Sequence, residues 1–397
     1  MAHQNNANNT SLTWGGVNAG SASPTSNTTA SRRNLYLKLF SGELFKGFQR
    51  NTIARDLITK RTLKNGRSMQ FIFTGRTNSE FHVPGQNILG NTDGAPPVAE
   101  VTIECDDLLI SSAFVYELDE TLAHYDLRGE ISRKIGYALA ENYDRRIFRA
   151  ITKAARQASP IQKTSFLEPG GTQIRVGTNN LGTDAYNAGS LVNAFYDAAA
   201  ALDEKGVSQD GRVGVLNPRQ YYELIQNAGT AATSLINRDV TGDALQSGNG
   251  IVEIAGIKVY KSMNIPFFGR FGTKYGGSGA TGTGVTDPGN SGSFVSEDMG
   301  NQAESATGVP DGQRTVNDYG EGNKFDNSCG LIFQKEAVGC VEAIGPQVQV
   351  TSGDVSVIYQ GDVILGRLAM GAAPLNPAAA VELIAGIAPN TGVAVPF

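Results

Sequence analysis

The sequence predicts an α+β protein, and three stretches of the chain carry this prediction. Between residues 67 and 105, two segments of alternating apolar and polar residues flank a group of turn residues, which is typical of a β-hairpin. From 127 to 158, apolar residues recur at steps of three and four, which predicts one long helix. From 329 to 370, short apolar segments separated by Gly and polar residues indicate a final set of strands.

The predicted hairpin places Phe71 and Phe73 on one face of its first strand, and Val101 and Ile103 on its second. Its tip, residues 77–97, contains proline and glycine turn signals. About eight residue pairs would make a ribbon of roughly 25 Å. A two-stranded ribbon alone is marginally stable in water, so this one needs a surface to lie on. That surface is either its own domain, as in an ordinary sheet, or another chain.

The predicted helix is about 48 Å long at 1.5 Å per residue. Ile135, Ile147 and Ile151 belong to its apolar stripe, and Ser159-Pro160 supplies the stop signal. We expect the opposite face to be wet or to lie at an interface, because it is densely charged. The charged residues of that face are Arg133, Lys134, Glu141, Asp144, Arg145 and Arg146.

The middle of the chain mixes both kinds of element. The pattern predicts a helix over 191–202, a strand over 212–216, a helix from Pro218 to 226, and a strand within 251–262. Residues 269–322 contain fourteen glycines and few apolar residues, so we expect a long surface insertion there. The later strands are expected at 329–333, 339–343, 347–350, 355–359 and 363–370.

Charge is distributed unevenly along the chain. Residues 31–68 carry a net charge of +8, so the remainder carries −13. A basic stretch beside an acidic body suits nucleic acid or an acidic neighbour, and a solvated basic surface is the alternative. Residues 1–30 are too polar to form a core and lack the pattern of a secretion signal, and no apolar run reaches the length of a membrane span.

Motifs for catalysis or cofactor binding are weak in this sequence. Residues 277–282 match the dinucleotide-binding pattern GxGxxG, but Asp287-Pro288 follows and the helix that this pattern needs cannot begin there. The three histidines (His3, His82 and His124) lie far apart, and the three cysteines form no CxxC pair and are expected to be buried free thiols. We therefore expect no enzyme, no metal and no cofactor.

The order of parts resembles the Hong-Kong-97-type capsid fold of tailed bacteriophages and herpesviruses. Specific stretches resemble the major capsid proteins of T-seven-like short-tailed phages (podoviruses), and their collinearity from about Leu35 to Val381 is what carries the resemblance. The main ones are Leu35-Tyr-Leu-Lys-Leu-Phe-Ser-Gly-Glu-Leu44, Pro84-Gly85-Gln-Asn87, His124-Tyr125-Asp126-Leu-Arg128, Arg212-Val-Gly-Val-Leu-Asn-Pro218, Gly256-Ile-Lys-Val-Tyr260 and Ala369-Met-Gly371.

The resemblance implies five parts within this α+β capsid fold. They are an N-terminal tail and basic arm (1–66), an extended hairpin or E-loop (67–105), a peripheral domain with the spine helix (106–190), an axial domain including the insertion 269–322 (191–345), and returning peripheral strands with a C-terminal tail (346–397). The insertion looks longer than the family pattern, and the tail after Ile384 has no counterpart in it.

The implied function is a coat protein that forms hexamers and pentamers of an icosahedral head around double-stranded DNA. Implied partners are copies of itself, a scaffolding protein, a portal protein at one vertex, and DNA bound without sequence specificity, with assembly in the host cytoplasm and no membrane involved. The residues expected at contacts between subunits are Arg55, Arg61, Arg67, Phe81, His82, Asn87 and Ile88. The type phage of this fold joins its subunits through a hairpin lysine, and the tip 77–97 has none, which implies non-covalent joints.

Three other functions compete with this one. An encapsulin-like shell around an enzyme shares the fold, and the phage-like stretches argue against it. A secreted polysaccharide-active enzyme or adhesin predicts a signal sequence and aromatic residues near carboxylates, whereas Trp14 is the only tryptophan. A DNA-binding protein is suggested by the basic arm, which we expect to meet acidic neighbours rather than to read sequence.

Overall fold

The computed structural model spans the 397 residues of the chain, and the fold is described for part of them. The described residues are 53–75, 81–85, 96–118, 127–163, 166–177, 187–226, 253–265, 317, 319, 328–350 and 358–384. Predictions about the tail and arm before residue 53, about Asn87, Ile88 and His124, and about most of the insertion lie outside them.

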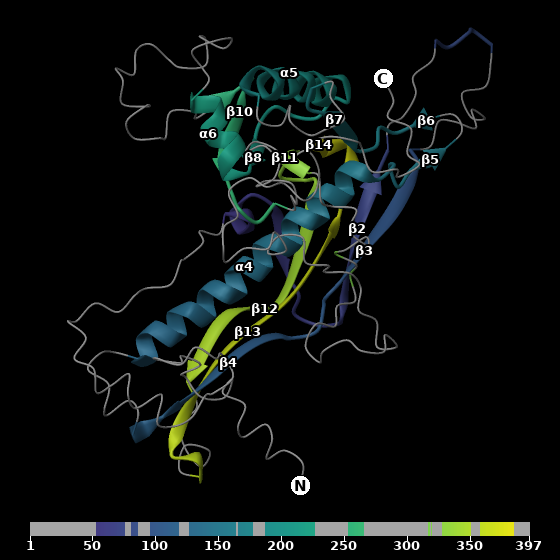
Figure 1. Ribbon diagram of the computed structural model, residues 1–397. Coiled ribbons are helices and arrows are strands. Elements are labelled where there is room, and N and C mark those ends of the chain that lie inside the picture. The colour runs from purple at the N-terminus through teal and green to yellow at the C-terminus, as the bar shows by residue number, and fades with distance from the viewer. Residues whose placement is uncertain are drawn as a thin grey trace, which may run out of the picture. The chain divides into compact units, whose positions relative to one another are not determined.

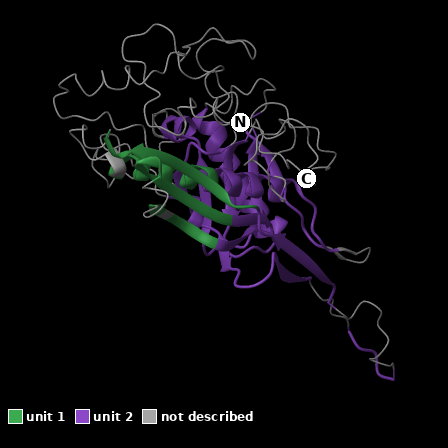
Figure 2. Cartoon of the chain, turned by 90° about the horizontal axis from the view of Figure 1, so that it is seen from below, with its two compact units in different colours: residues 1–51, 107–142, 344–369 green, residues 52–106, 143–343, 370–397 purple. Residues whose placement is uncertain are grey.

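The chain forms two compact units, coloured green and purple in Figure 2. Unit 1 comprises residues 1–51, 107–142 and 344–369, and unit 2 comprises 52–106, 143–343 and 370–397. Three elements contribute residues to both units. They are helix α4 (Leu127–Arg156) and strands β12 (Val338–Val350) and β13 (Gly361–Pro374).

A four-stranded sheet has the order β1-β12-β13-β4, with β1 (Thr59–Thr62) and β4 (Leu109–Tyr116) as its edges. Figure 1 shows its strands β12, β13 and β4 side by side. β1 runs parallel to β12, and β13 runs antiparallel to β4. Neither edge strand is predicted from the sequence. The two strands predicted at 339–343 and 347–350 are one continuous strand, β12, and the strand predicted at 363–370 extends over the whole of β13.

The core of unit 2 is a six-stranded sheet with two helices, α5 (Ala188–Glu204) and α6 (Pro218–Gln226). Every residue of its strands β8 and β14 is buried, as expected for mostly apolar central strands, and this includes the charged Arg212 and Glu382. The sheet order is β7 (Thr172–Arg175), β14 (Ala380–Ile384), β11 (Ser328–Gln334), β8 (Arg212–Leu216), β10 (Ile257–Lys261) and β9 (Glu253–Ile254).

Helix α5 covers this sheet with Leu191, Phe195 and Leu202, none of which is exposed to solvent. Asn187 caps the helix by accepting the N–H groups of Gly189 and Ser190. The smaller elements of the fold are η1 (Ala54–Asp56), β5 (Gln162–Lys163), β6 (Phe166–Leu167) and η3 (Pro377–Ala379). The helices and strand predicted between 191 and 226 are confirmed.

Helix α4 ends at Arg156, two residues before the predicted end. In unit 1 its residues Ile131, Ile135 and Leu139 pack against Val115 and Ile364. The prediction of a wet or interfacial charged face is wrong where the helix passes through unit 2. There Asp144, Arg145 and Arg146 are buried within the subunit, while Arg133 and Lys134 are exposed as expected.

Two further predictions need correction. Ile358 and Tyr359 have helical rather than extended backbone, so the strand predicted at 355–359 is absent at these two residues. Tyr319 lies near the end of the predicted surface insertion, yet it is among the largest fully buried side chains of the described residues. The average composition of a segment rich in Gly, Ser and Asn does not reveal a single buried residue such as Tyr319.

Candidate assembly surfaces

The hairpin is a separate two-stranded sheet of β2 (Ser68–Thr74) and β3 (Val98–Glu104). The two segments pair as predicted, and the register joins Phe71 to Val101 and Met69 to Ile103. Backbone bonds beyond both ends of the ladder, from Gly75 N–H to the Pro97 carbonyl and from Cys105 N–H to the Arg67 carbonyl, are both 2.8 Å long. Among the described strands, the hairpin is therefore not part of a larger sheet, which argues against its being one hairpin of an ordinary sheet in its own domain.

The root of the hairpin packs on its own chain. Phe71 and Ile103 are 7% and 0% exposed, and a methyl group added at Gly339 of β12 would approach Ile103 to 2.7 Å. A larger residue at 339 would have to displace the end of the Ile103 side chain, because the hairpin root lies directly against the strand there. This contact supplies part of the surface that a two-stranded ribbon needs.

The outer face and the tip of the hairpin are open in the isolated subunit. On the outer face Ile72 is 76% exposed and Val98 is 62% exposed. At the tip Phe81 is fully exposed, with His82 and Val83 beside it in sequence and also exposed. Apolar side chains that are exposed to water on a two-stranded ribbon indicate that this part of the hairpin binds another surface.

The three arginines predicted at subunit contacts have different surroundings. The Arg55 guanidinium makes two bonds to the Glu342 carboxylate, at 3.1 and 3.0 Å, within its own chain. The Arg61 guanidinium lies 5.0 Å from the ring centre of Phe71, over the hairpin root. Arg67 is exposed at the start of the hairpin. Arg61 and Arg67 therefore belong to the hairpin surface, whereas Arg55 also holds its own subunit together.

Glu342 joins Arg55 to the buried part of α4, because Tyr143 donates its hydroxyl to the same carboxylate at 2.8 Å. Burial alone would push the pKa of Glu342 upward, but the bonds from Arg55 and Tyr143 outweigh burial and hold that pKa below its ordinary value. Burial first, and then the neighbouring Cys340 and Glu342, raise the pKa of Tyr143 far above its usual range. The hydroxyl therefore stays protonated and serves as a donor.

A second buried cluster lies where the hairpin ends. The Asp106 carboxylate accepts the Asn317 N–H and side-chain amide, both at 3.0 Å, and the Tyr319 hydroxyl at 2.7 Å. Arg146 of α4 lies 3.7 Å from the same carboxylate. Burial raises the pKa of Asp106, and the bonds from Asn317, Tyr319 and Arg146 act against that rise. The cluster ties the second hairpin strand to α4 through residues of the predicted insertion.

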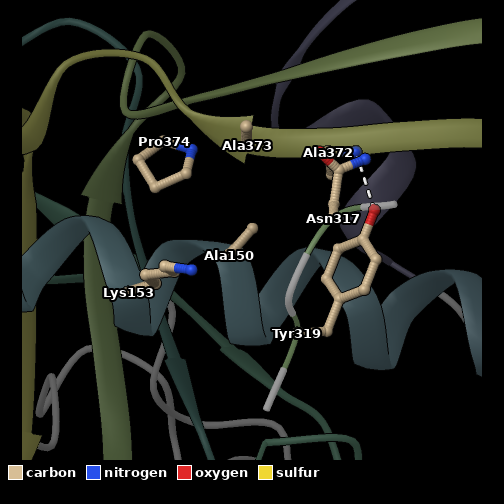
Figure 3. Close-up of a pocket in the computed structure, with 7 residues that line it drawn as sticks. All are labelled: Ala150, Lys153, Asn317, Tyr319, Ala372, Ala373 and Pro374. Atoms are coloured by element: carbon tan, nitrogen blue, oxygen red, sulfur yellow. Dashed lines mark hydrogen bonds between the residues drawn. The ribbon is translucent and has the colours of Figure 1, made fainter. Parts of the chain in front are cut away.

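Tyr319 also borders a small cavity, shown in Figure 3. Its hydroxyl accepts the Ala372 N–H at 2.9 Å, and the other lining residues include Ala150 and Lys153 of α4. The cavity volume is about 60 Å³, which holds a few water molecules and is far below the roughly 300 Å³ of a small-ligand pocket.

The buried carboxylate of Asp144 binds the first residues that the structure describes. It accepts the backbone N–H groups of Ile53 at 2.9 Å and Ala54 at 3.2 Å. Burial raises the pKa of Asp144 to about 6, although these two N–H groups favour the ionised form. A carboxyl group with a raised pKa stabilises the fold most below the unfolded value near 4, and this stabilisation is lost as the pH rises through about 6.

We expect the wild-type subunit to gain about 1 kcal/mol of unfolding free energy relative to Asp144→Asn when the pH falls from 7 to 5. The reason is that Asn cannot take up the proton that the folded wild type binds in this range. Denaturant unfolding of both proteins at the two pH values measures the difference. Parallel changes in the two proteins would contradict the assignment.

The described residues take part in packing, hydrogen bonds and ion pairs. They contain no group of three or more His, Cys, Asp or Glu side chains placed to hold a metal ion. The cysteines Cys105, Cys329 and Cys340 are free and buried, as predicted, and burial raises the pKa of the Cys340 thiol to about 12. Among the helices described, none combines the length and apolarity needed to cross a membrane.

Comparison with known proteins agrees with the fold. A family model described as "Gp10A-like: Major capsid protein" matches residues 71–303, more than half of the chain. The chain belongs to this family. The resemblance to the major capsid proteins of T-seven-like phages is therefore confirmed, and this Gp10A-like chain is a phage major capsid protein, a structural component of the virion shell that associates with copies of itself.

Relatives of this Gp10A-like protein are aligned over most of its length. The major capsid protein of Escherichia phage T7 is 24% identical over 355 residues, covering 88% of this chain and 91% of the relative. In the capsid structure of cyanophage P-SCSP1u, the matching chain is 29% identical with a TM-score of 0.65, covering 92% of this chain and 97% of the other. The mature capsid of bacteriophage PhiM1, at 15% identity and a TM-score of 0.57, shows the shared fold alone.

The Hong-Kong-97-type capsid fold predicted for this Gp10A-like chain is confirmed at the level of the whole fold, and the encapsulin-like alternative is not favoured. Sequence reasoning missed the three buried clusters around Asp106, Glu342 and Asp144. The sequence pattern groups Asp144 with the charged residues of α4, and it does not show which of these residues other chain segments cover.

Proposed function

We propose that this chain assembles as hexamers and pentamers into an icosahedral head that encloses double-stranded DNA. Residues 1–66 would serve as the arm, 67–105 as the E-loop, 106–190 and 346–397 as the peripheral domain, and 191–345 as the axial domain. The observation that carries the proposal is the hairpin, whose root packs on its own chain while Ile72, Phe81 and Val98 remain exposed. Family membership supports it.

The hairpin contact fits a closed shell on energetic grounds. A modest apolar interface between each pair of subunits, repeated by closed symmetry, gives a container whose stability is collective. Scaffolding protein during assembly in the host cytoplasm, a portal protein at one vertex, and non-specific contact with packaged DNA complete the proposal. None of these steps requires a bound cofactor.

The contents of purified particles test the DNA part of the proposal. Particles recovered from infected cells should contain nuclease-protected double-stranded DNA, measured by absorbance ratio and gel after protein digestion. Particles filled with a protein cargo and free of nucleic acid would instead support a nanocompartment shell.

The basic residues are expected to act in assembly. Neutralising Arg61 and Arg67 together should reduce the yield of shells and lower the thermal midpoint of the subunit only slightly, because neither side chain is buried and the exposed contact of Arg61 with Phe71 is worth about 0.5–1 kcal/mol. Neutralising Arg55 should lower that midpoint as well, since it removes both bonds to Glu342. Sedimentation and differential scanning fluorimetry measure the two effects. Normal particles that fail only to package DNA would contradict a role in assembly.

The joints between subunits are expected to be non-covalent. Residues 77–97 contain no lysine, so the hairpin tip cannot supply the amine of an isopeptide bond. Mature particles boiled in denaturant should run on a gel as a single band at the mass of one chain, 41.9 kDa. A ladder of multimers under the same conditions would refute this.

A further inference from the structure

We propose that the outer edge of strand β4 binds residues 35–40 of a second copy of this chain as an added β-strand. The inference rests on the proposed function in one respect, namely that copies of the chain lie side by side in a shell. It adds the site on the subunit, the segment that occupies it, and the mode of contact.

The geometry of β4 leaves one backbone edge open. Among the described strands, β4 is the last in the sheet order and pairs only with β13 (Figure 1). Glu117 donates its N–H to the Gln360 carbonyl at 3.1 Å, which makes these two residues a hydrogen-bonded pair. Because bonded and non-bonded pairs alternate along an antiparallel ladder, the N–H and carbonyl groups of the even-numbered residues Ile110, Ser112, Phe114 and Tyr116 point away from β13.

No residue in the part of the chain that the structure describes pairs with this outer edge. The strand also lacks the usual protection of an edge, because its sequence Leu-Ile-Ser-Ser-Ala-Phe-Val-Tyr contains no charge, no proline and no glycine. Ile110 is 55% exposed and Tyr116 is 37% exposed, and the flanking Leu108 and Leu118 are 45% and 42% exposed. A long, uncharged, apolar edge of this kind is a template for another strand.

The stretch 35–40 has the pattern of such a strand. It reads Leu-Tyr-Leu-Lys-Leu-Phe, with leucine at every second position, so one face of an extended segment would be wholly aliphatic. Its charge is complementary to the ends of β4. Arg32, Arg33 and Lys38 stand within or just before it, whereas the exposed acids Asp107 and Glu117 flank β4.

The sheet order places the two ends of the proposed contact at opposite edges of one sheet. The described chain begins at Ile53 and joins the sheet through β1, which lies at the opposite end of the strand order from β4. A segment that extends from the β1 edge of one copy to the β4 edge of the next makes a head-to-tail contact. Contacts of that kind form rings where the rotation between copies closes, as it does in a hexamer or pentamer.

Hydrogen exchange on the full chain tests the site. In assembled shells, the amides of Ile110, Ser112, Phe114 and Tyr116 should exchange about 100-fold more slowly than in dissociated subunits. The odd-numbered amides between them, which already bond to β13, serve as the internal control and should change little. Unchanged even-numbered amides in shells would overturn the proposal, and so would full protection already present in subunits, since the occupant would then be the chain itself.

A synthetic peptide of residues 31–42 tests the occupant without shell assembly. Added to dissociated full-length subunits, it should slow the same four amides, whereas a peptide carrying Leu37→Pro should not. The subunit variant Ser112→Pro should abolish the effect and Ser112→Thr should retain it, because the Ser112 N–H points outward and proline there costs no bond to β13. Equal protection by both peptides, or by neither, would overturn the proposal. Subunits that respond to the peptide yet never form shells would contradict the proposed function and leave this inference standing.

Discussion

Replacing residues 76–96 by the dipeptide Asn-Gly is expected to yield a soluble subunit that forms no closed shells. Gly75 and Pro97 are already joined by a 2.8 Å backbone bond, so a two-residue turn can connect them without disturbing the ladder. The root contact of Phe71 and Ile103 is retained, and so should be the fold of the subunit. What is lost is the exposed tip around Phe81, the segment free to reach another copy.

Electron microscopy of the purified variant measures shell formation, and circular dichroism with thermal unfolding measures the fold. In a matched variant, residues 76–96 are replaced by a Gly-Ser linker of equal length. This variant distinguishes the effect of the side chains at the tip from the effect of the length of the tip. Both variants should lack shells if side chains at the tip make the contact. Normal shells from the Asn-Gly variant would show that the hairpin has no part in closure.

Replacing Glu382 by Leu is expected to lower the unfolding free energy of the subunit by about 3–5 kcal/mol. The Arg156 guanidinium donates two bonds to the Glu382 carboxylate, at 2.7 and 2.6 Å, and both side chains are almost wholly buried. Gln173 donates to it at 2.8 Å, and Ser328 also donates to it. Removing the carboxylate leaves the buried cation of Arg156 without its ion-pair partner, which is the source of the large cost.

The double variant Arg156→Met, Glu382→Leu should recover much of that loss, because no unpaired charge remains in the core. A control is available in Asp203, whose ion pair with Arg212 is half exposed on the Asp203 side. Asp203→Asn should change the unfolding free energy far less than Glu382→Leu. Denaturant titration of the four proteins measures these effects, and a small loss for Glu382→Leu with a larger one for the double variant would contradict this explanation.

Periodicity predicted the elements that have one strongly patterned face. The two hairpin strands, helix α4 and the all-buried strand β8 follow from apolar spacing, because burial on one face or both leaves a regular signal. The strand β4 was missed because its two central serines and its exposed Ile110 and Tyr116 break the alternation. An edge strand is specified by its partner β13, which lies far away in sequence.

The candidate surfaces were predictable only in part. Exposure of Phe81 and His82 at the hairpin tip follows from turn chemistry, which the sequence contains. The intrachain pairing of Arg55 with Glu342 does not, since the two residues are separated by 287 positions and each reads as an ordinary surface charge. The burial of Asp144 and Arg146 likewise depends on which chain segments cover α4, and charge patterns on a single helix carry no information about that.

A cryo-electron microscopy reconstruction of particles assembled from this chain, alone and with a candidate scaffolding protein, tests the central claim most directly. We predict closed icosahedral shells in which the hairpin 67–105 of each copy lies on a neighbouring copy beyond its root at Gly339. Absence of closed particles under both conditions would contradict this account. So would shells in which every hairpin folds back along its own subunit.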